Sequence, residues 1–481
     1  MPLKQFAIDF LELAKEASNR FDVDFADFNK NERQERYSFR DLFEIVNSTK
    51  KERMDLIDHL DDDFYYAEIG NVTKQGDVEP EKLNFSNINE LVADYFKKIE
   101  KGDIQKSNEN DILLAKVRPN LRKYVFVDEK NKDYFYTTAF INLKPRKLNK
   151  IFYYAFRTIF YNDLMAISRQ GKGYPTLKED DLFYLKFSKA AIDKLEKLEN
   201  EIISQIEPIE NKIKELKNQI SPAQEAMNKV FAREFGFDLE KIHKIDNDRK
   251  FYIDLSLLDF KNNNLRSSYR WSQLERVQGE LYKNNDSIDF LGKFIKSTKN
   301  GWSPECNEDE GGQAILGIDS IQKNGKMTFG NPKYTQQTRN NSRDFFVQNG
   351  DFFVSRGNTL GLVALAAVAK VESEDKEFIY PDLMIKIKFD ENEINKEYIA
   401  YAFNSIIGRI YFKYSAKGKN QTMVKISSKE LYDFELPIPD IKRQQKIVDE
   451  IKAELDKQEE MKKKIEVERK KIDEIIEKAI K

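Results

Sequence analysis

Four short segments of the chain combine Lys and Arg with Asn, Gln and Gly. They are VRPNLRK (117–123), SRQGKGY (168–174), SRGNT (355–359) and SAKGKNQT (415–422). Lys and Arg neutralise phosphates and displace counterions from a polyanion, while Arg, Asn and Gln can hydrogen-bond guanine and adenine edges in the major groove. The segments therefore predict duplex DNA as the ligand. The candidate DNA-binding residues are Lys116, Arg118, Asn120, Arg122, Lys123, Arg169, Lys172, Arg356, Asn358, Lys417, Lys419, Asn420 and Gln421.

The positive charge of these segments is local. The 481 residues include 81 Lys and Arg against 83 Asp and Glu, a formal charge of −2, unlike the basic balance typical of nucleic-acid-binding proteins. Residues 111–178, however, hold fourteen Lys and Arg against five acids, and residues 405–425 hold five against none. Residues 52–68 hold seven acids and one Arg, which hides this excess in the total. Charge alone leaves open that the basic segments are ordinary solvated loops.

Catalytic and cofactor motifs are absent from the sequence. It has no GxxxxGK[ST] loop for ATP, and no Gly-rich strand–helix turn followed by a ribose-binding acid. The tetrapeptide NPKY (331–334) lacks the second proline of an amino-methyltransferase motif, and Met384 occupies the place where a nuclease core needs a second acid before Lys386. One cysteine and two histidines exclude a disulfide framework and a His-rich metal site. We therefore expect a chain without catalytic residues, cofactor or metal.

The basic segments occupy corresponding places in a tandem repeat. The aligned pairs are 27–39 with 259–271, 110–121 with 350–361, 136–144 with 380–388, 152–160 with 399–407, and 171–172 with 418–419. In the first pair Tyr37 aligns with Tyr269, and in the second Lys116 aligns with Arg356. The offset changes only from 232 to 247 residues along these pairs, and it is 249 for Leu182 and Leu431 just beyond them. Matches in the same order at a nearly constant offset predict a duplication; chance similarity in a Lys-, Asn- and Phe-rich chain is the alternative.

Each repeat ends in a predicted long helix with a heptad seam of apolar residues. The first series is Ile192, Leu195, Glu199, Ile202, Ile206, Ile209, Ile213, Leu216, Ile220, Ala223, Met227 and Val230; Pro208 is expected to bend the helix and Ser221-Pro222 to restart it. The second series is Ile441, Val448, Ile451, Leu455, Ile465, Ile472, Ile476 and Ala479, interrupted by Gln444, Gln458, Lys462 and Arg469. We expect the two helices to pair antiparallel as a spacer about 60 Å long.

The sequence predicts an α+β fold with two duplicated mixed α/β domains joined by two long helices in an intramolecular antiparallel coiled coil. Apolar runs such as DILLAKV, FFVSR and LMIKIKF indicate strands within each domain, and Gly and Asn clusters indicate turns. We place the first domain at residues 1–188 and its helix at 189–236, and the second domain at 237–438 and its helix at 439–481.

This organisation resembles the specificity subunit of a type I restriction–modification enzyme. The stretch GKNQTMVKISSKELYDFELPIPDIKRQQKIVDEI (418–451) is similar to the family's Gly-x-x-Gln…Ile-Ser…Leu…Leu-Pro-x-Pro…Gln…Ile junction between recognition domain and helix. The matching residues are Gly418, Gln421, Ile426, Ser427, Leu431, Leu436, Pro437, Pro439, Gln444 or Gln445, and Ile447. The stretch LGKFIKSTKNGWSPE…AILGIDSIQKNG also resembles the family's opening strand and loop.

The resemblance implies a non-catalytic subunit that reads a bipartite target in double-stranded DNA, one half-site for each target-recognition domain. It implies partner methyltransferase subunits, two in number, that use S-adenosylmethionine to methylate adenine, and a restriction subunit that adds ATP- and Mg-dependent translocation and cleavage. The first repeat departs from the pattern: residues 171–195 keep Gly171 and Leu182 but lack the Gln and the Leu-Pro-x-Pro, and Val117 replaces Gly357.

Two other function classes stay open from the sequence. One is a coiled-coil interaction scaffold whose basic loops are incidental, and the other is an enzyme with an unrecognised site. The N-terminal stretch carries acids among its apolar residues, so it does not predict a signal peptide. The longest uncharged apolar run, residues 360–369, is too short to cross a bilayer. We therefore expect a cytoplasmic protein with no membrane partner.

Overall fold

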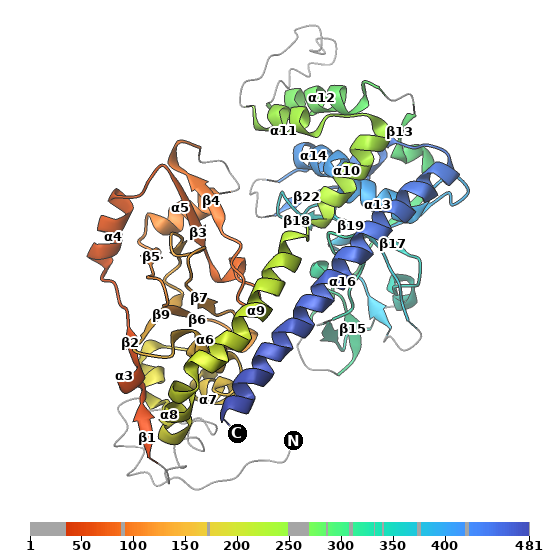
Figure 1. The fold of residues 1–481 in the computed structure, drawn as a ribbon. Coiled ribbons are helices and arrows are strands. Elements are labelled where there is room, and N and C mark those ends of the chain that lie inside the picture. The colour runs from red at the N-terminus through yellow and green to blue at the C-terminus, as the bar shows by residue number, and fades with distance from the viewer. Residues whose placement is uncertain are drawn as a thin grey trace. The chain divides into compact units, whose positions relative to one another are not determined.

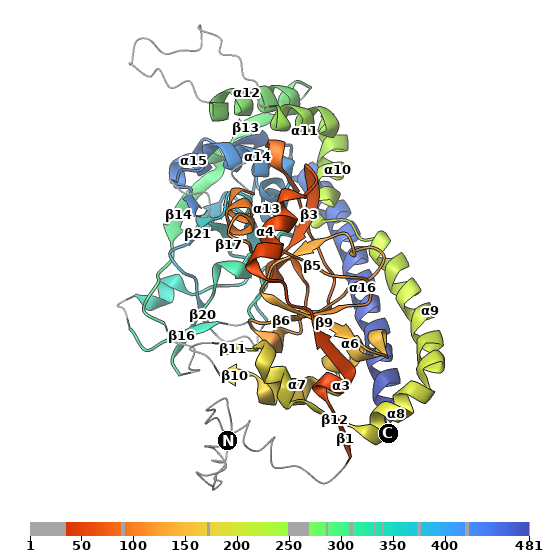
Figure 2. The same cartoon turned by 90° about the vertical axis from the view of Figure 1, so that its left-hand side faces the viewer.

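The computed structural model divides the chain into two compact units (Figure 1), shown from a second direction in Figure 2. Unit 1 comprises Met1–Lys217 with Lys463–Lys481, and unit 2 comprises Asn218–Lys462. The structure describes residues 35–87, 92–170, 174–248, 269–284, 287–306, 311–330, 332–338, 341–372, 377–418 and 423–480. None of the helices among these residues is both long and apolar enough for a membrane span.

Unit 1 is built around two four-stranded sheets. The first has the order β2-β9-β6-β7 and comprises Phe43–Ile45, Phe140–Pro145, Ile112–Ala115 and Val125–Phe126. The second has the order β4-β3-β8-β5 and comprises Glu81–Asn84, Asp63–Ala67, Phe135–Tyr136 and Gln105–Lys106. All four residues of β6 are buried, as a strand covered on both faces requires. The helices are α3 (Phe39–Leu42), α4 (Lys50–Asp58), α5 (Ala93–Ile99), α6 (Asn149–Arg157) and α7 (Tyr161–Ile167).

Unit 2 repeats this plan. Its larger sheet has the order β14-β21-β17-β19 and comprises Ile295–Asn300, Met384–Phe389, Phe352–Ser355 and Ala366–Val368. Its smaller sheet has the order β16-β15-β20 and comprises Lys333–Thr335, Gln313–Ile315 and Phe378–Ile379. The helices of its globular part are α11 (Leu239–Asn247), α12 (Tyr269–Tyr282), α13 (Lys396–Asn404), α14 (Ile406–Ser415) and α15 (Ser428–Tyr432).

The two units share strand register as well as strand order. Ile112 of β6 pairs with Leu143 of β9, and Phe352 of β17 pairs with Ile387 of β21. Phe352 follows Ile112 by 240 residues and Ile387 follows Leu143 by 244, which are the offsets of the sequence alignment for these two segments. The turn before each strand is also the same, because Asn110 and Gly350 both have positive φ, 72° and 81°. The predicted duplication is therefore confirmed for the aligned segments from residue 110 to 160.

The predicted start of the repeat is wrong. Tyr37 lies in β1 (Arg36–Ser38), which pairs with β12 (Lys186–Ser188), whereas Tyr269 begins helix α12. The counterpart of β1 is β13 (Ile288–Phe290), which pairs with β23 (Glu435–Pro437) in the same antiparallel manner. Residues 27–34 and 259–268 of the predicted alignment lie outside the described residues. A shared aromatic pattern led the alignment to join a strand to a helix.

The first long segment is three helices rather than one. They are α8 (Lys189–Lys197), α9 (Glu199–Asn218) and α10 (Ala223–Phe235). The chain continues helically through Pro208 and breaks before Pro222, which takes the N-cap position of α10. Ser221 does not cap this helix as predicted; its hydroxyl accepts a hydrogen bond from the Gln458 amide at 3.1 Å. The second long segment is one uninterrupted helix, α16 (Ile441–Ile480), of 40 residues.

Within unit 2, α10 runs antiparallel to the first part of α16. Ser221 contacts Gln458, Arg233 pairs with Glu450, and the Glu234 carbonyl accepts from Arg443. Later residues of the α10 segment therefore contact earlier residues of α16. Val448, Ile451 and Leu455 belong to the same buried core as Met227 and Val230. Within unit 1, Lys212 of α9 pairs with Glu468 of α16 at 2.6 Å.

The seam differs from the predicted heptad positions at two places. Ile441 is 37% exposed, and the buried residue near position 462 is Met461 rather than Lys462. Of the predicted polar interruptions, Gln444 is fully buried. Its side-chain amide is satisfied there because it donates to the Glu393 and Pro439 carbonyls, each at 2.8 Å. The drift between a strict heptad and the 3.6-residue helical turn accounts for a shift of one position.

Candidate nucleic-acid interface

In unit 1 the two predicted basic segments lie side by side. The loop after β6 contacts the hairpin of β10 (Arg169–Gln170) and β11 (Pro175–Thr176). The Leu177 amide donates to the Lys116 carbonyl at 2.8 Å, and the Arg118 amide donates to the Pro175 carbonyl at 3.0 Å. Segments about fifty residues apart in sequence are therefore joined by main-chain hydrogen bonds into one surface.

Unit 2 joins its two basic segments in the same way. Strand β18 (Gly357–Asn358) pairs antiparallel with β22 (Val424–Lys425), and the Ile426 amide donates to the Arg356 carbonyl at 2.9 Å. Lys417 and Lys425 exchange two main-chain hydrogen bonds of 2.9 and 2.8 Å. A Cβ atom at Gly357 would lie 3.1 Å from the Leu383 side chain and 3.3 Å from that of Lys425, so the two segments cross closely at this point.

The loop of unit 1 has a constrained backbone. Arg118 and Arg122 have positive φ angles of 52° and 53°, which L residues seldom adopt, and they flank the short 3-10 helix η3 (Pro119–Leu121). The buried Tyr124 hydroxyl holds this turn by donating to the Pro119 carbonyl at 2.8 Å. Strained conformations of this kind concentrate at functional sites, where the surrounding structure maintains them.

Two aromatic rings hold the arginine side chains of this loop. The Arg118 guanidinium lies 5.1 Å from the centre of the Tyr174 ring, and that of Arg122 lies 3.8 Å from the centre of the Tyr161 ring. Such cation–π contacts limit the freedom of an arginine while leaving its N–H donors available at the ring edge. Neither guanidinium forms an ion pair with a described residue. Both arginines are therefore suited to contact DNA.

Other predicted cations are held by acids. Arg169 donates to Asp181 through Nε and Nη2, at 2.8–3.0 Å, and Lys417 binds Glu430 at 2.6 Å. Asp181 and Glu430 are buried, and each also accepts a hydrogen bond from a main-chain amide that begins the next helical turn, that of Lys178 or Ser427. Arg169 and Lys417 thus fix each hairpin to the following helical turn, in addition to any contact with DNA.

The remaining described candidates differ in their partners. Lys116 pairs with Glu179 at 2.6 Å, and Lys123 donates to the Ile69 carbonyl at 3.0 Å. Burial, and the nearby charge of Lys74, lower the pKa of Lys123. Arg356 approaches the Asp382 carbonyl only at 3.5 Å, and Asn358 accepts from the Thr359 amide at 2.8 Å.

The last described candidate, Asn120, is held through its carbonyl, which accepts from the Tyr161 hydroxyl at 3.3 Å. Lys172, Lys419, Asn420 and Gln421 lie outside the described residues.

Two exposed, largely apolar residues beside the hairpins were not predicted as site residues from the sequence. Tyr174 directly precedes β11 and is 42% exposed, and Met423 directly precedes β22 and is 47% exposed. They lie 249 residues apart, the offset that also relates Asp181 to Glu430. The repeat alignment extended back from Leu182 and Leu431, which also lie 249 residues apart, would have found them, but the cation pattern did not include apolar residues.

The described residues contain no group of three or more His, Cys, Asp or Glu that could hold a metal ion. Cys306 is exposed, and its thiol donates to the Pro304 carbonyl at 3.2 Å. His59 is also on the surface, where its Nδ1 lies 2.7 Å from the Asp55 carbonyl. Both contacts are to main-chain carbonyls a few residues earlier in the chain, so neither pairs Cys306 or His59 with another side chain.

The fold and site define a class of protein: a duplicated α+β chain in which each unit presents a cationic loop and hairpin. Residues 290–469, which cover most of the second repeat and the first part of its helix, match the family described as Type I restriction modification DNA specificity domain. The chain therefore carries a type I restriction–modification specificity domain, and over this span the family resemblance seen in the sequence is confirmed.

Among curated proteins, none matches the chain. Among solved structures, it is similar to the S subunit of the type I restriction–modification system of M. genitalium, with 12% identity over 94% of this chain and 96% of that chain and a TM-score of 0.39. The HsdS subunit of Thermoanaerobacter tengcongensis is 12% identical over 93% of this chain and 96% of that chain, with a TM-score of 0.30. A chain from a type I restriction–modification assembly is 12% identical over 93% of this chain and 97% of that chain, with a TM-score of 0.34.

Proposed function

We propose that this chain is the DNA sequence-specificity subunit of a type I restriction–modification complex and reads a bipartite target. The observation that carries the proposal is the specificity-domain match over residues 290–469, in a unit whose loop-and-hairpin surface is repeated in unit 1. Main-chain contacts hold the loop and hairpin of each unit together, and arginines on those surfaces have the donors that read guanine. Each unit therefore reads one half-site.

The proposal includes partners that perform the chemistry. Two DNA methyltransferase subunits would bind this chain, and a restriction subunit would join them where the system cleaves DNA. S-adenosylmethionine, ATP and Mg belong to those partners in this proposal, and this chain itself is non-catalytic and cytoplasmic. Turnover of labelled S-adenosylmethionine by the purified chain with DNA, in the absence of a partner, would contradict the non-catalytic assignment.

The test of the proposed function is the pattern of methylated adenines in a host that expresses the chain with its methyltransferase. We expect methylation at one bipartite motif, present with the chain and absent without it. Methylation of adenines in random sequence by a complex that contains the chain would refute sequence-specific reading.

Charge reversal separates DNA reading from a scaffold role. Arg356→Glu combined with Lys417→Glu and Lys419→Glu introduces three acids into the basic segments of the second repeat, and we expect at least a tenfold loss of methylation at the motif because phosphates repel them. Lys333→Glu is the matched control, since Lys333 is an exposed cation of β16 in the same unit. Unchanged methylation in the triple variant would favour a scaffold.

A further inference from the structure

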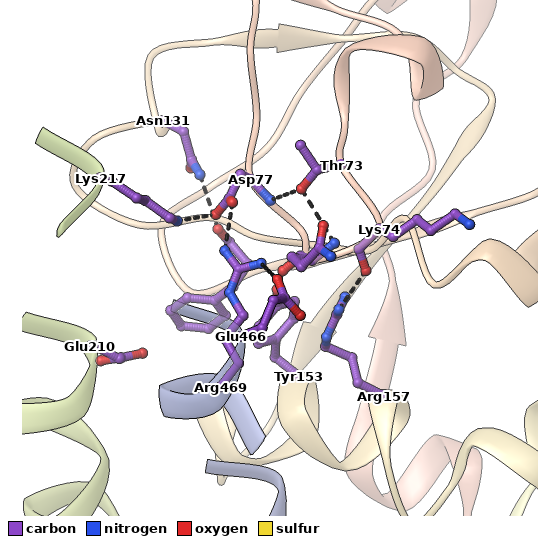
Figure 3. A network of polar contacts seen from close by, with 12 residues as sticks. Thr73, Lys74, Asp77, Asn131, Tyr153, Arg157, Glu210, Lys217, Glu466 and Arg469 are labelled. Atoms are coloured by element: carbon purple, nitrogen blue, oxygen red, sulfur yellow. Dashed lines mark hydrogen bonds and ion pairs between the residues drawn. The ribbon is translucent and has the colours of Figure 1, made fainter. Parts of the chain in front are cut away.

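Asp77 ties a surface turn of unit 1 to both long helices (Figure 3). Its carboxylate binds Lys217 near the end of α9 and, at 2.6 Å, Arg469 of α16. Burial alone would raise the pKa of Asp77, but the charges of Arg469 and Lys217 lower it overall, so the carboxylate stays ionised. The turn that carries Asp77 therefore responds to the positions of the two helices.

The same turn fits closely against helix α6. Gly76 has a φ of 88°, and a Cβ atom there would lie 2.0 Å from the Tyr153 hydroxyl, so only glycine fits. The Tyr153 hydroxyl donates to the Gln75 carbonyl at 3.3 Å. Helix α6 and the turn are therefore packed directly against each other.

Arg157, the last residue of α6, connects this turn to the candidate DNA-binding loop. One arm of its guanidinium donates to the Lys74 carbonyl at 2.6 Å, and the other donates to the Arg122 carbonyl at 2.7 Å. Arg122 is a constrained residue of the loop and a candidate DNA contact. The planar fork of arginine suits such a two-sided bridge, and a lysine could not reproduce both contacts in this geometry.

Helix α16 also acts on this bridge through charge. Burial raises the pKa of Asp473, and the positive charges of Arg157 and Arg122 oppose that rise. Asp473 is thus close enough to interact with both arginines, and it lies one helical turn beyond Arg469. The helix that holds the turn at Asp77 therefore also faces the loop at Arg122.

Unit 2 is built differently at the corresponding positions. Asn404 ends α13 as Arg157 ends α6, but its amide exchanges hydrogen bonds of 2.8 and 2.9 Å with Ala366 of β19. The isolated bridges Val72–Val78 and Ile321–Met327 make Lys326 the counterpart of Asp77, and Lys326 pairs with Asp456 of α16 at 3.3 Å. A contact between this turn and α16 is therefore present in both repeats, whereas the guanidinium bridge from the turn to the DNA-binding loop is found, among the described residues, in the first repeat.

We propose that Arg157 is a positioning residue that couples the DNA-binding loop of the first repeat to the long helices through the turn at Lys74–Asp77. The inference rests on the proposed function. Disturbing Arg157, Asp77 or Arg469 changes how the first repeat reads its half-site, and the second repeat keeps its own reading.

The experiment selects bound sequences from a randomised duplex DNA library with the full-length chain, and compares base preference at the two half-sites. We expect Arg157→Ala to lower preference at one half-site about tenfold, and Asp77→Ala to lower it at the same half-site. Arg356→Ala, in unit 2, assigns the other half-site. Because the network acts as one unit, Asp77→Ala should add little in the Arg157→Ala background.

Two further variants keep the result interpretable. Arg157→Lys retains the charge but places its donors on a single nitrogen, so a partial loss of preference is expected at an unchanged melting temperature. Lys470→Ala removes an exposed cation beside Arg469 and should change neither half-site. Equal weakening of both half-sites by Arg157→Ala, or no change, would overturn the coupling while leaving the proposed function intact. A wild-type chain that selects no motif would instead refute the proposed function, and the coupling with it.

Discussion

Tyr174 and Met423 present apolar surface to water at equivalent points of the two hairpins, 42% and 47% exposed. Apolar side chains among phosphate-binding cations contact thymine methyl groups or base faces in DNA complexes. We expect Tyr174→Ser and Met423→Ser to weaken specific DNA binding by about 1–3 kcal/mol each. Titration of the full-length chain with a duplex that contains the selected motif measures this.

Because both side chains are exposed, these substitutions should change the free energy of unfolding by less than about 0.5 kcal/mol. Val467→Ser provides the control, since Val467 is 54% exposed on α16, away from the hairpins in the sequence, and should alter neither binding nor stability. A loss of stability as large as the loss of binding would show that Tyr174 and Met423 act on folding instead.

Residue types were sufficient to predict the cationic segments, but they could not show which of their arginines and lysines are paired with acids in the folded chain. Arg118 and Arg169 look alike in sequence, yet one rests on a ring and the other is bound by buried Asp181. The acid that holds Arg169 lies twelve residues further along the chain, and only the fold of the hairpin brings the two together. Charge counts report composition, whereas function depends on which charges stay unpaired after folding.

Glu430, in the first turn of α15 after the hairpin of unit 2, makes the stability of this element depend on pH. Burial raises the pKa of Glu430, but hydrogen bonds from Lys417 and Ser427 lower it overall. A carboxyl with a lowered folded-state pKa stabilises the fold above its unfolded pKa of about 4.3, and this contribution disappears as pH falls through the folded value. Acid should therefore loosen α15 and β22 together.

Glu430→Gln tests this dependence. The amide keeps an acceptor for the Ser427 amide but loses the charge that binds Lys417, so we expect a loss of about 1–2 kcal/mol at neutral pH. Below about pH 4 the difference between variant and wild type should shrink, because Glu430 of the unfolded chain then takes up a proton, and it should vanish once the pH falls below the lower folded-state pKa. Urea unfolding at several pH values measures the difference in unfolding free energy between Glu430→Gln and the wild type. Asp433→Asn, a nearby acid-to-amide change, is the control. A difference that is constant with pH would contradict the assigned charge pairing.

The buried strands and the length of α16 followed from sequence pattern, but the strand pairing partners and the separation of α8 from α9 did not. The match of 110–121 with 350–361 is correct because both begin a fully buried strand after the same tight turn. The match of Tyr37 with Tyr269 failed because aromatic spacing alone does not distinguish a strand from a helix. The position of α10 depended on Pro222, whose role at the N-cap differs by one residue from the expected first turn.

At the scale of the whole chain, the formal charge of −2 means that attraction to DNA must come from the two local surfaces. Lys116, Arg169 and Lys417 are engaged by Glu179, Asp181 and Glu430. Arg118, Arg122 and Arg356 form no ion pair with a described residue. If these three and the sequence candidates Lys172 and Lys419 contact phosphates, roughly five counterions are displaced from the DNA.

The affinity of the full-length chain for duplex DNA should therefore fall with salt at a slope of about −4.5 in log K against log salt concentration. Fluorescence anisotropy with the selected duplex over a range of salt concentrations gives the slope. Arg118→Gln should reduce its magnitude by about one, whereas Arg169→Gln should lower stability more than the slope, because Arg169 neutralises Asp181 within the fold. A slope nearer −7 would mean that Lys116, Arg169 and Lys417 leave their acids on binding, so that recognition would require the hairpins to rearrange.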